Sequence, residues 1–172
     1  MNNTLLIFLP SVIVVVFTLI LIYLFMNQEN RRRHQEIRVK ESSEMFKLRM
    51  QAYERLTLLL ERLNPESLIL REQRHDLSAL QFQAHLLKII RTEFDHNLTM
   101  QIYVTIPTWE KVKAAKEGLV RLINTTANNI DKKAPALELG RFLIENTGRD
   151  LNLYFNDAIA SIRKEMNDLY GK

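Results

Sequence analysis

The sequence predicts an all-α protein, in which an N-terminal transmembrane helix continues into a polar stalk helix. A compact helical domain containing a long antiparallel helix hairpin is expected to follow. Three observations support this fold class. The 172 residues include only four Gly and four Pro, both of which are unfavourable inside helices. A long uncharged apolar run lies near the N-terminus, and beyond it apolar residues recur at every third or fourth position.

The apolar run extends from Leu5 to Met26 and predicts a transmembrane anchor within residues 1–26. Its 22 residues contain no charged side chain, and at about 1.5 Å per residue they can cross a hydrocarbon core of about 30 Å. A cleaved signal peptide would need a basic N-terminal region, a shorter apolar stretch and small residues at a cleavage site. Because none of these features is present, we expect an uncleaved anchor.

Three consecutive arginines, Arg31, Arg32 and Arg33, follow the apolar run, whereas Met1 to Thr4 contains no Lys or Arg. The positive-inside rule therefore predicts a single-pass protein of the cytoplasmic (inner) membrane, with its N-terminus outside and its C-terminal domain in the cytoplasm. The arginines either set this topology alone or also contact anionic lipid head groups.

The net charge of +4 is local. Seven of the 24 basic residues but only three of the 20 acidic residues lie between Arg31 and Arg49, so the rest of the chain is neutral. A nucleic-acid-binding face is therefore not expected. The chain has no cysteine, which excludes disulfides, thiolate nucleophiles and cysteine-ligated zinc.

Residues 27–44 are polar and contain neither Gly nor Pro, which predicts a solvated stalk helix before a helical domain at residues 45–172. The first helix of that domain carries apolar residues with partial heptad spacing, here called the 46–63 stripe. It consists of Phe46, Tyr53, Leu56, Leu60 and Leu63. This stripe is either part of a hydrophobic core or a seam for self-association into a homo-oligomer.

Asn64-Pro65 predicts the end of this helix, with Pro65 opening the next one. After the charged linker REQRHD, Asp76 is the expected N-cap of a long helix. Its apolar face is predicted to comprise Leu80, Ala84, Leu87, Ile90, Phe94, Leu98 and Ile102. The β-branched run from Ile102 to Ile106 could instead form a short strand, but a lone strand would have no partner, so we expect helix.

Pro107 predicts a break, and Thr108 is the expected N-cap of the second long helix. Its apolar face is predicted to comprise Trp109, Val112, Leu119, Val120 and Ile123. Two long helices joined by so short a connection are expected to lie antiparallel.

A short helix is predicted from Ala136 to Asn146, ending before Gly148. Asp150 is expected to open a last helix that reaches Tyr170. The apolar face of this last helix is predicted to comprise Leu151, Phe155, Ile159 and Ile162.

Two Glu-x-x-His pairs, Glu72 with His75 and Glu93 with His96, have the spacing that places a carboxylate and an imidazole on one helical face. Di-iron carboxylate bundles use such pairs as metal ligands. If the two pairs form a metal site, all four side chains must converge in space. Neither a nucleophile elbow nor a phosphate-binding glycine motif is present.

The segments RMQAYERLTLLLERLNPESLILR and LLKIIRTEFDHNLTMQIYVTIPTWEKVKAAKEGLVRLIN resemble a family of uncharacterised small bacterial single-pass membrane proteins. The resemblance runs from Met50 to about Asn124. It implies an N-terminal anchor and a mostly helical cytoplasmic domain, and it supplies no catalytic residues.

The leading hypothesis is a membrane-anchored, non-enzymatic interaction module, acting as an adaptor or accessory subunit of a cytoplasmic-membrane complex. Its expected partners are membrane lipids and a protein of that complex, and no cofactor is predicted. The alternative is a helical metal-binding protein or enzyme that uses the two Glu-x-x-His pairs. A third hypothesis, a stalk like the peripheral-stalk subunit of rotary ATPases, is disfavoured because a compact domain is expected after Asn64.

Overall fold

A computed structural model describes the backbone of residues 3–170, while the side chains of residues 3–15, 30–39, 41, 149 and 170 lie outside the described part. The chain divides into two compact units, Met1–Lys47 and Leu48–Lys172, here called unit 1 and unit 2. Every regular element among the described residues is helical, which confirms the all-α prediction. These elements are α1 (Asn3–Leu63), α2 (Pro65–Glu72), α3 (Ala79–Asn97), the 3₁₀ helix η1 (Leu98–Ile102), α4 (Ile106–Asn128), α5 (Ala136–Glu145) and α6 (Arg149–Tyr170).

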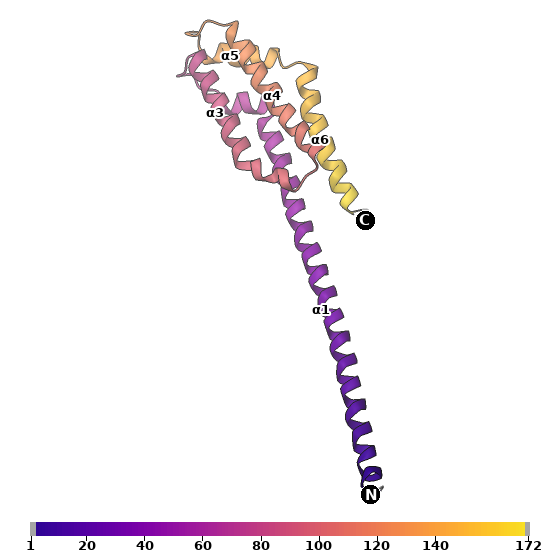
Figure 1. The fold of residues 1–172 in the computed structure, drawn as a ribbon. Helices are drawn as coiled ribbons and strands as arrows, with labels where there is room; N and C mark the ends of the chain where they lie inside the picture. The colour runs from indigo at the N-terminus through magenta and orange to yellow at the C-terminus, as the bar shows by residue number, and fades with distance from the viewer. Residues whose placement is uncertain (1–2, 171–172) are drawn as a thin grey trace. The chain divides into compact units, whose positions relative to one another are not determined.

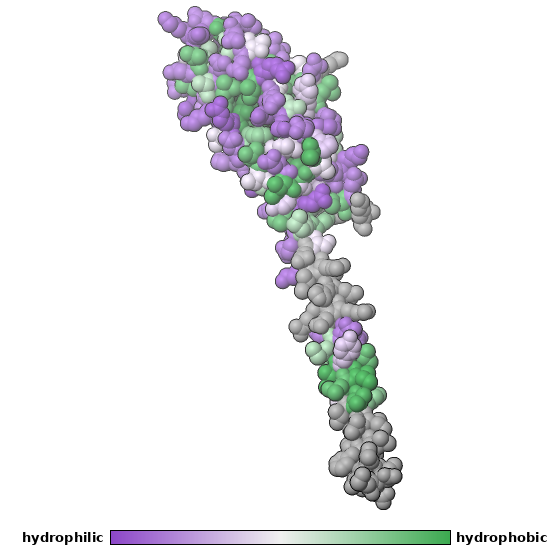
Figure 2. Space-filling view, in the orientation of Figure 1, coloured by the Kyte–Doolittle hydropathy of each residue, from purple (hydrophilic) through white to green (hydrophobic). Residues whose placement is uncertain are grey.

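Unit 1 consists of the first part of α1. Apolar side chains from Val16 to Met26 are exposed on this helix and form the green band in Figure 2. Among the described residues, no helix combines the length and the apolar character that a membrane span requires. The predicted anchor Leu5 to Met26 falls partly on residues 3–15, and the side chains of Arg31, Arg32 and Arg33 likewise lie outside the described part.

Unit 2 begins at Leu48, three residues after the expected boundary, and its first element is the last part of α1. Tyr53, Leu56, Leu60 and Leu63 of the 46–63 stripe are buried in the hydrophobic core. The stripe is therefore used inside unit 2 from Tyr53 onward. Phe46, its first member, belongs to unit 1 and is half-buried.

The prediction that Asp76 caps the first long helix is wrong, because Ser78 caps α3 instead. The Ser78 hydroxyl accepts the backbone N–H of Gln81 at 3.3 Å, and the Gln81 side chain accepts the backbone N–H of Ser78 at 2.9 Å. This reciprocal arrangement satisfies two backbone donors at once.

The predicted apolar face of α3 is also partly wrong. The buried side chains of its apolar face are Ala79, Phe82, Leu86, Ile90 and Phe94, and Leu87 is half-buried. Four predicted members of the face are exposed, namely Leu80, Ala84, Leu98 and Ile102. Leu98 and Ile102 are exposed because they lie beyond Asn97, where the α-helix has already ended. Leu80 and Ala84 are exposed because the buried face of the first turns follows Ala79, Phe82 and Leu86 instead.

The connection between the two long helices is neither the continuous helix that we expected nor the short strand that was the alternative. The α-helix stops at Asn97, η1 follows, and no strand forms in this described segment. Thr105 rather than Thr108 caps α4, and its hydroxyl accepts the backbone N–H of Thr108 at 3.5 Å. Pro107 then lies in the first turn of α4, where its missing N–H costs no helical hydrogen bond.

In unit 2, α3, α4 and α6 run side by side, with successive helices antiparallel, and α5 lies across the end at which α3 begins (Figure 1). The predicted antiparallel hairpin is confirmed as α3 and α4. A short backbone bridge ties the starts of α3 and α5 together, since Ala79 N–H donates to Ala134 at 2.7 Å and Ala136 N–H donates to Leu77 at 3.0 Å. One hydrophobic core draws on α1 to α6.

Candidate functional site

A groove of about 610 Å³ lies between α3 and α4 in unit 2 and is here called the α3–α4 groove. Its floor is apolar, its rim carries charges of both signs, and one end is formed by amides and a hydroxyl. The lining residues are Leu87, Ile90, Arg91, Phe94, Asp95, Lys116, Glu117, Val120, Arg121, Asn124, Thr125 and Asn128.

The floor of the groove is a continuation of the core. Ile90 and Phe94 are buried members of the core, whereas Leu87 and Val120 are half-buried and pack against it from the groove side. Leu87, Ile90 and Phe94 lie three and four residues apart on α3 and therefore share one face of that helix. The groove thus exposes the edge of an apolar face that no described element covers completely.

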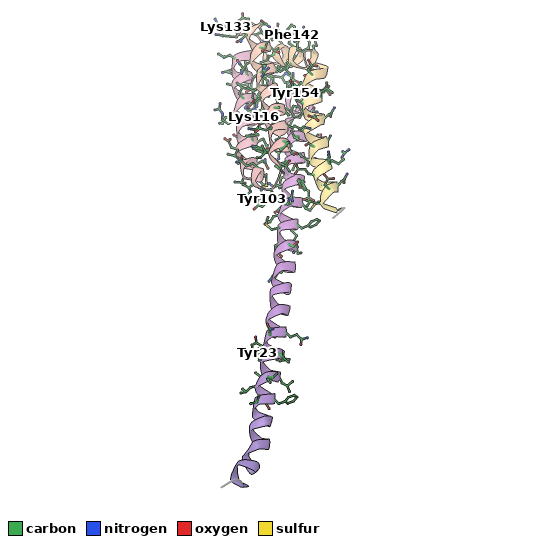
Figure 3. The ribbon with its side chains drawn as sticks, turned by 45° about the vertical axis from the view of Figure 1, so that its right-hand side comes forward. Tyr23, Tyr103, Lys116, Lys133, Phe142 and Tyr154 are labelled. Atoms are coloured by element: carbon green, nitrogen blue, oxygen red, sulfur yellow. The ribbon has the colours of Figure 1, made fainter. Side chains whose placement is uncertain are left out.

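A stack of three side chains forms one end of the floor. The Lys116 ammonium lies 4.5 Å from the centroid of the Phe94 ring, within the range of a cation–π interaction. The Phe94 ring stacks in turn on Trp109, with 5.4 Å between the ring centroids. Figure 3 labels Lys116 on α4. Trp109 is the one tryptophan of the chain, so its fluorescence reports on this end of the groove.

The rim charges remain available to a ligand. Arg91 and Asp95 lie four residues apart on α3, and Glu117 and Arg121 lie four residues apart on α4. This spacing permits ion pairs within each helix. None of the four pairs with a described side chain in this structure. A binding partner could therefore engage all four without first breaking an ion pair.

The amide end of the groove holds the two helices together. The Gln83 side chain of α3 donates to the Asn124 side chain of α4 at 3.0 Å. At the other end of the groove, the contact between Phe94 of α3 and Lys116 of α4 also joins the two helices. The two contacts fix the spacing of the groove walls.

A second groove, of about 470 Å³, lies on the other flank of α4, against α6. Glu117, Arg121 and Thr125 line both grooves, so this face of α4 forms a ridge between them. At Gly118, an added Cβ would meet the Leu151 side chain at 3.0 Å. The absence of a side chain at Gly118 therefore allows α6 to approach α4 closely.

A polar network joins the beginning of α4 to α6 and α1. The Glu165 carboxylate accepts the backbone N–H of Thr105 at 3.2 Å and also accepts its hydroxyl, while the Tyr53 hydroxyl donates to the same carboxylate at 3.4 Å. Burial raises the pKa of Tyr53 above its ordinary value and Glu165 reinforces this effect, while Arg49 opposes it. The network stabilises the packing of α6 and offers no open site.

The structure does not bring the four predicted metal ligands together. Glu72 lies 3.2 Å from the Nε2 atom of His85 and 2.9 Å from the Nε atom of Arg71, rather than beside His75. Glu93 forms an ion pair with Arg62 at 2.8 Å.

Both His75 and His96 are exposed. No group of three or more His, Asp or Glu side chains in the described part of the chain is arranged to hold a metal ion. Nearby basic side chains therefore account for the environment of both glutamates.

The α3–α4 groove was not predicted from the sequence, although two of its features are visible there. Arg91-x-x-x-Asp95 and Glu117-x-x-x-Arg121 place charges of opposite sign beside the apolar positions Ile90 and Val120. A pair of this kind is common on solvated helices. Only the packing of α3 against α4 turns the two pairs into the rim of one groove.

The model of a family of unknown function (DUF7935) matches residues 1–169 of the chain. No curated protein and no solved structure matches it significantly.

Proposed function

The chain belongs to DUF7935, a family of unknown function, and from its own geometry we propose that it is a membrane-anchored, non-enzymatic interaction module. It acts as an adaptor or accessory subunit of a cytoplasmic-membrane complex. Its N-terminal segment is the anchor, and the α3–α4 groove of unit 2 binds a partner protein of the complex. The groove is the observation that carries this proposal.

The lining of the groove favours binding over catalysis, and its size is that of a ligand site. A volume of about 610 Å³ lies within the range of ligand sites, which is about 300 to 1,000 Å³. An apolar floor with a charged rim is typical of protein interaction surfaces. The described lining contains no His, Cys or Ser, so the pairs of a Ser or Cys nucleophile with a His base have no counterpart there.

The anchor is supported by the sequence of residues 5–26 and by the apolar side chains exposed from Val16 to Met26 (Figure 2). So many exposed apolar side chains on one helix would be unfavourable in water. The arginines Arg31, Arg32 and Arg33 orient the protein with unit 2 in the cytoplasm and meet the lipid head groups.

Single-cysteine cross-linking tests the groove, because the natural chain has no cysteine. Val120→Cys places a photoreactive maleimide label in the groove, and Leu80→Cys, at an exposed position of α3 outside the groove lining, is the matched control. After illumination of native membranes, we expect a stoichiometric adduct with one protein from the Val120→Cys variant alone. Equal adducts from both positions, or none from either, would refute the groove as a docking site.

The anchor and its orientation are tested separately. The full-length protein should remain in the membrane fraction after alkaline carbonate extraction. A membrane-impermeant maleimide should label Asn2→Cys in intact cells and should label Leu80→Cys only after permeabilisation. Release by carbonate would refute the anchor, and the reverse labelling pattern would refute the orientation.

A further inference from the structure

The walls of the α3–α4 groove determine which kind of partner segment can enter it. On α4 the lining extends from Lys116 to Asn128, which corresponds to about 18 Å or roughly three helical turns. Both walls are helices, whose internal backbone groups are already hydrogen-bonded and offer no edge for an added strand. A third helix can instead pack its side-chain ridges between those of α3 and α4.

The charges lie in a defined order along the groove. The helices α3 and α4 are antiparallel (Figure 1), and the Gln83–Asn124 hydrogen bond fixes their register. Counting along both helices from this bond places Arg91 level with Lys116, whose ammonium lies over Phe94. Arg121 then lies toward the amide end, and Asp95 lies toward the opposite end.

Counted in the same way, Lys116 and Glu117 lie on α4 level with Arg91, and their opposite charges offset each other. Arg91 and Arg121 therefore leave this part of the groove basic overall, and Asp95 makes the opposite end acidic. Arg121 and Arg91 stand on opposite walls, so both can reach a side chain between them. Asp95 lies about 10 Å farther along the groove, because some six to seven residues at about 1.5 Å each separate it from their midpoint. Two turns of a helix cover the same distance. An acidic residue and a basic residue seven positions apart on a bound helix would therefore meet opposite charges.

Resting on the function proposed above, we infer that the occupant of the α3–α4 groove is an amphipathic helix of a different protein. It spans about three turns and rests its apolar face on Leu87, Ile90, Phe94 and Val120. An acidic side chain lies between Arg91 and Arg121, and a basic side chain seven residues away meets Asp95.

Charge complementarity disfavours a second copy of this chain as the occupant. In a two-fold pair with parallel α4 helices, Glu117 and Arg121 would each face their own equivalents, which places like charges together. An antiparallel pair would match Glu117 with Arg121, and the dimer measurement described below tests that arrangement.

Three designed helical peptides of about 15 residues provide the test on the full-length protein in detergent micelles. All share one apolar face, and they differ in two rim positions seven residues apart. One peptide carries Glu and Lys there, one carries Glu at both positions and one carries Lys at both. Binding is followed through the fluorescence of Trp109, which stacks on Phe94 at the floor of the groove.

We expect the Glu/Lys peptide to bind about two- to fivefold more tightly than either like-charged peptide. The variant Asp95→Lys should reverse this preference toward the peptide with two Glu residues, because its groove is then basic at both ends. Asp95 is exposed and unpaired among the described side chains, so this change should leave the fold intact.

The results separate this inference from the proposed function. Three results would overturn the helix assignment: equal affinities for the three peptides, no binding, or an unchanged preference in Asp95→Lys. The cross-linking result would still decide whether the groove binds a partner protein. A dimer that is lost in Val120→Asp but kept in Leu80→Asp would overturn the inference in favour of a second copy.

Discussion

Truncating one leucine of the 46–63 stripe distinguishes a core position from a self-association seam. The side chain of Leu60 is 1% exposed within the core of unit 2, whereas Leu58, on the same helix, is 57% exposed. Leu60→Ala replaces a buried isobutyl side chain with a methyl group and leaves a cavity, and such changes cost about 2 to 5 kcal/mol in the free energy of unfolding. Leu58→Ala creates no cavity, because this side chain is exposed, and should lower the free energy of unfolding by less than about 0.5 kcal/mol.

Thermal unfolding of the full-length protein in detergent, followed by Trp109 fluorescence, measures the difference. For a unit of this size, about 3 kcal/mol corresponds to a fall in Tm of roughly 10 °C. We therefore expect Leu60→Ala to melt about 10 °C below Leu58→Ala, and the double variant Leu56→Asp with Leu60→Asp to lose its fold. A folded monomer from that double variant, or equal Tm values for the two alanine variants, would identify the stripe as a seam and refute its assignment to the core.

Two further predictions concern helix packing and pH. Gly118→Ala should destabilise the protein by about 1 to 2 kcal/mol, because its Cβ would meet a buried side chain of α6 at 3.0 Å. At Gly140 the nearest atom lies at 3.4 Å, so Gly140→Ala should instead gain up to about 1 kcal/mol from helix propensity. Urea denaturation compares the two variants, and destabilisation of equal size in both would contradict the packing argument. Burial acts to raise the pKa of Glu72, but hydrogen bonds from Arg71 and His85 outweigh it and lower that pKa below its ordinary value of 4.5. Ionised Glu72 therefore stabilises the fold above about pH 4.5, and this contribution is lost as the pH falls through the lowered pKa. The natural protein should be more stable than Glu72→Gln at pH 6, and this difference in the free energy of unfolding should shrink toward pH 3. A difference that is constant with pH would contradict this prediction.

Regular apolar spacing predicted the helices of unit 2 wherever packing followed the pattern of the sequence. Most predicted members of the apolar faces of α4 and α6 are buried, namely Trp109, Val112, Leu119 and Ile123 on α4 and Leu151, Phe155 and Ile162 on α6. The small buried residues Ala115 and Ala158 were not predicted. Each of these helices begins close to a recognisable Pro or acidic residue and keeps one face toward the core throughout. Local pattern and tertiary packing therefore indicate the same residues.

Predictions failed where neighbouring residues competed for the same role. Asp76 and Ser78 are both good N-cap residues, and the choice of Ser78 depends on Gln81, whose side chain completes the capping box. Thr105 and Thr108 compete in the same way at the start of α4. Thr105 prevails because it leaves Pro107 in the first turn and because Glu165 of α6 accepts its backbone N–H, a contact that only the tertiary structure reveals.

The α3–α4 groove could not be predicted from the sequence either, and here the physical reason is different. Leu87 and Val120 have the spacing of core residues, and both were predicted to lie on apolar faces of helices. Whether such a residue is buried depends on how many helices surround its own, and α6 packs along the other flank of α4. The position above Leu87 and Val120 is therefore left to solvent in the described structure, at the place where a fourth neighbouring helix would complete the packing. The unpaired charges of Arg91 and Asp95 lie beside this position, so a helix that binds there would contact them as well as the apolar floor. The partner should therefore be sought by the charges of its helix as well as by its hydrophobicity.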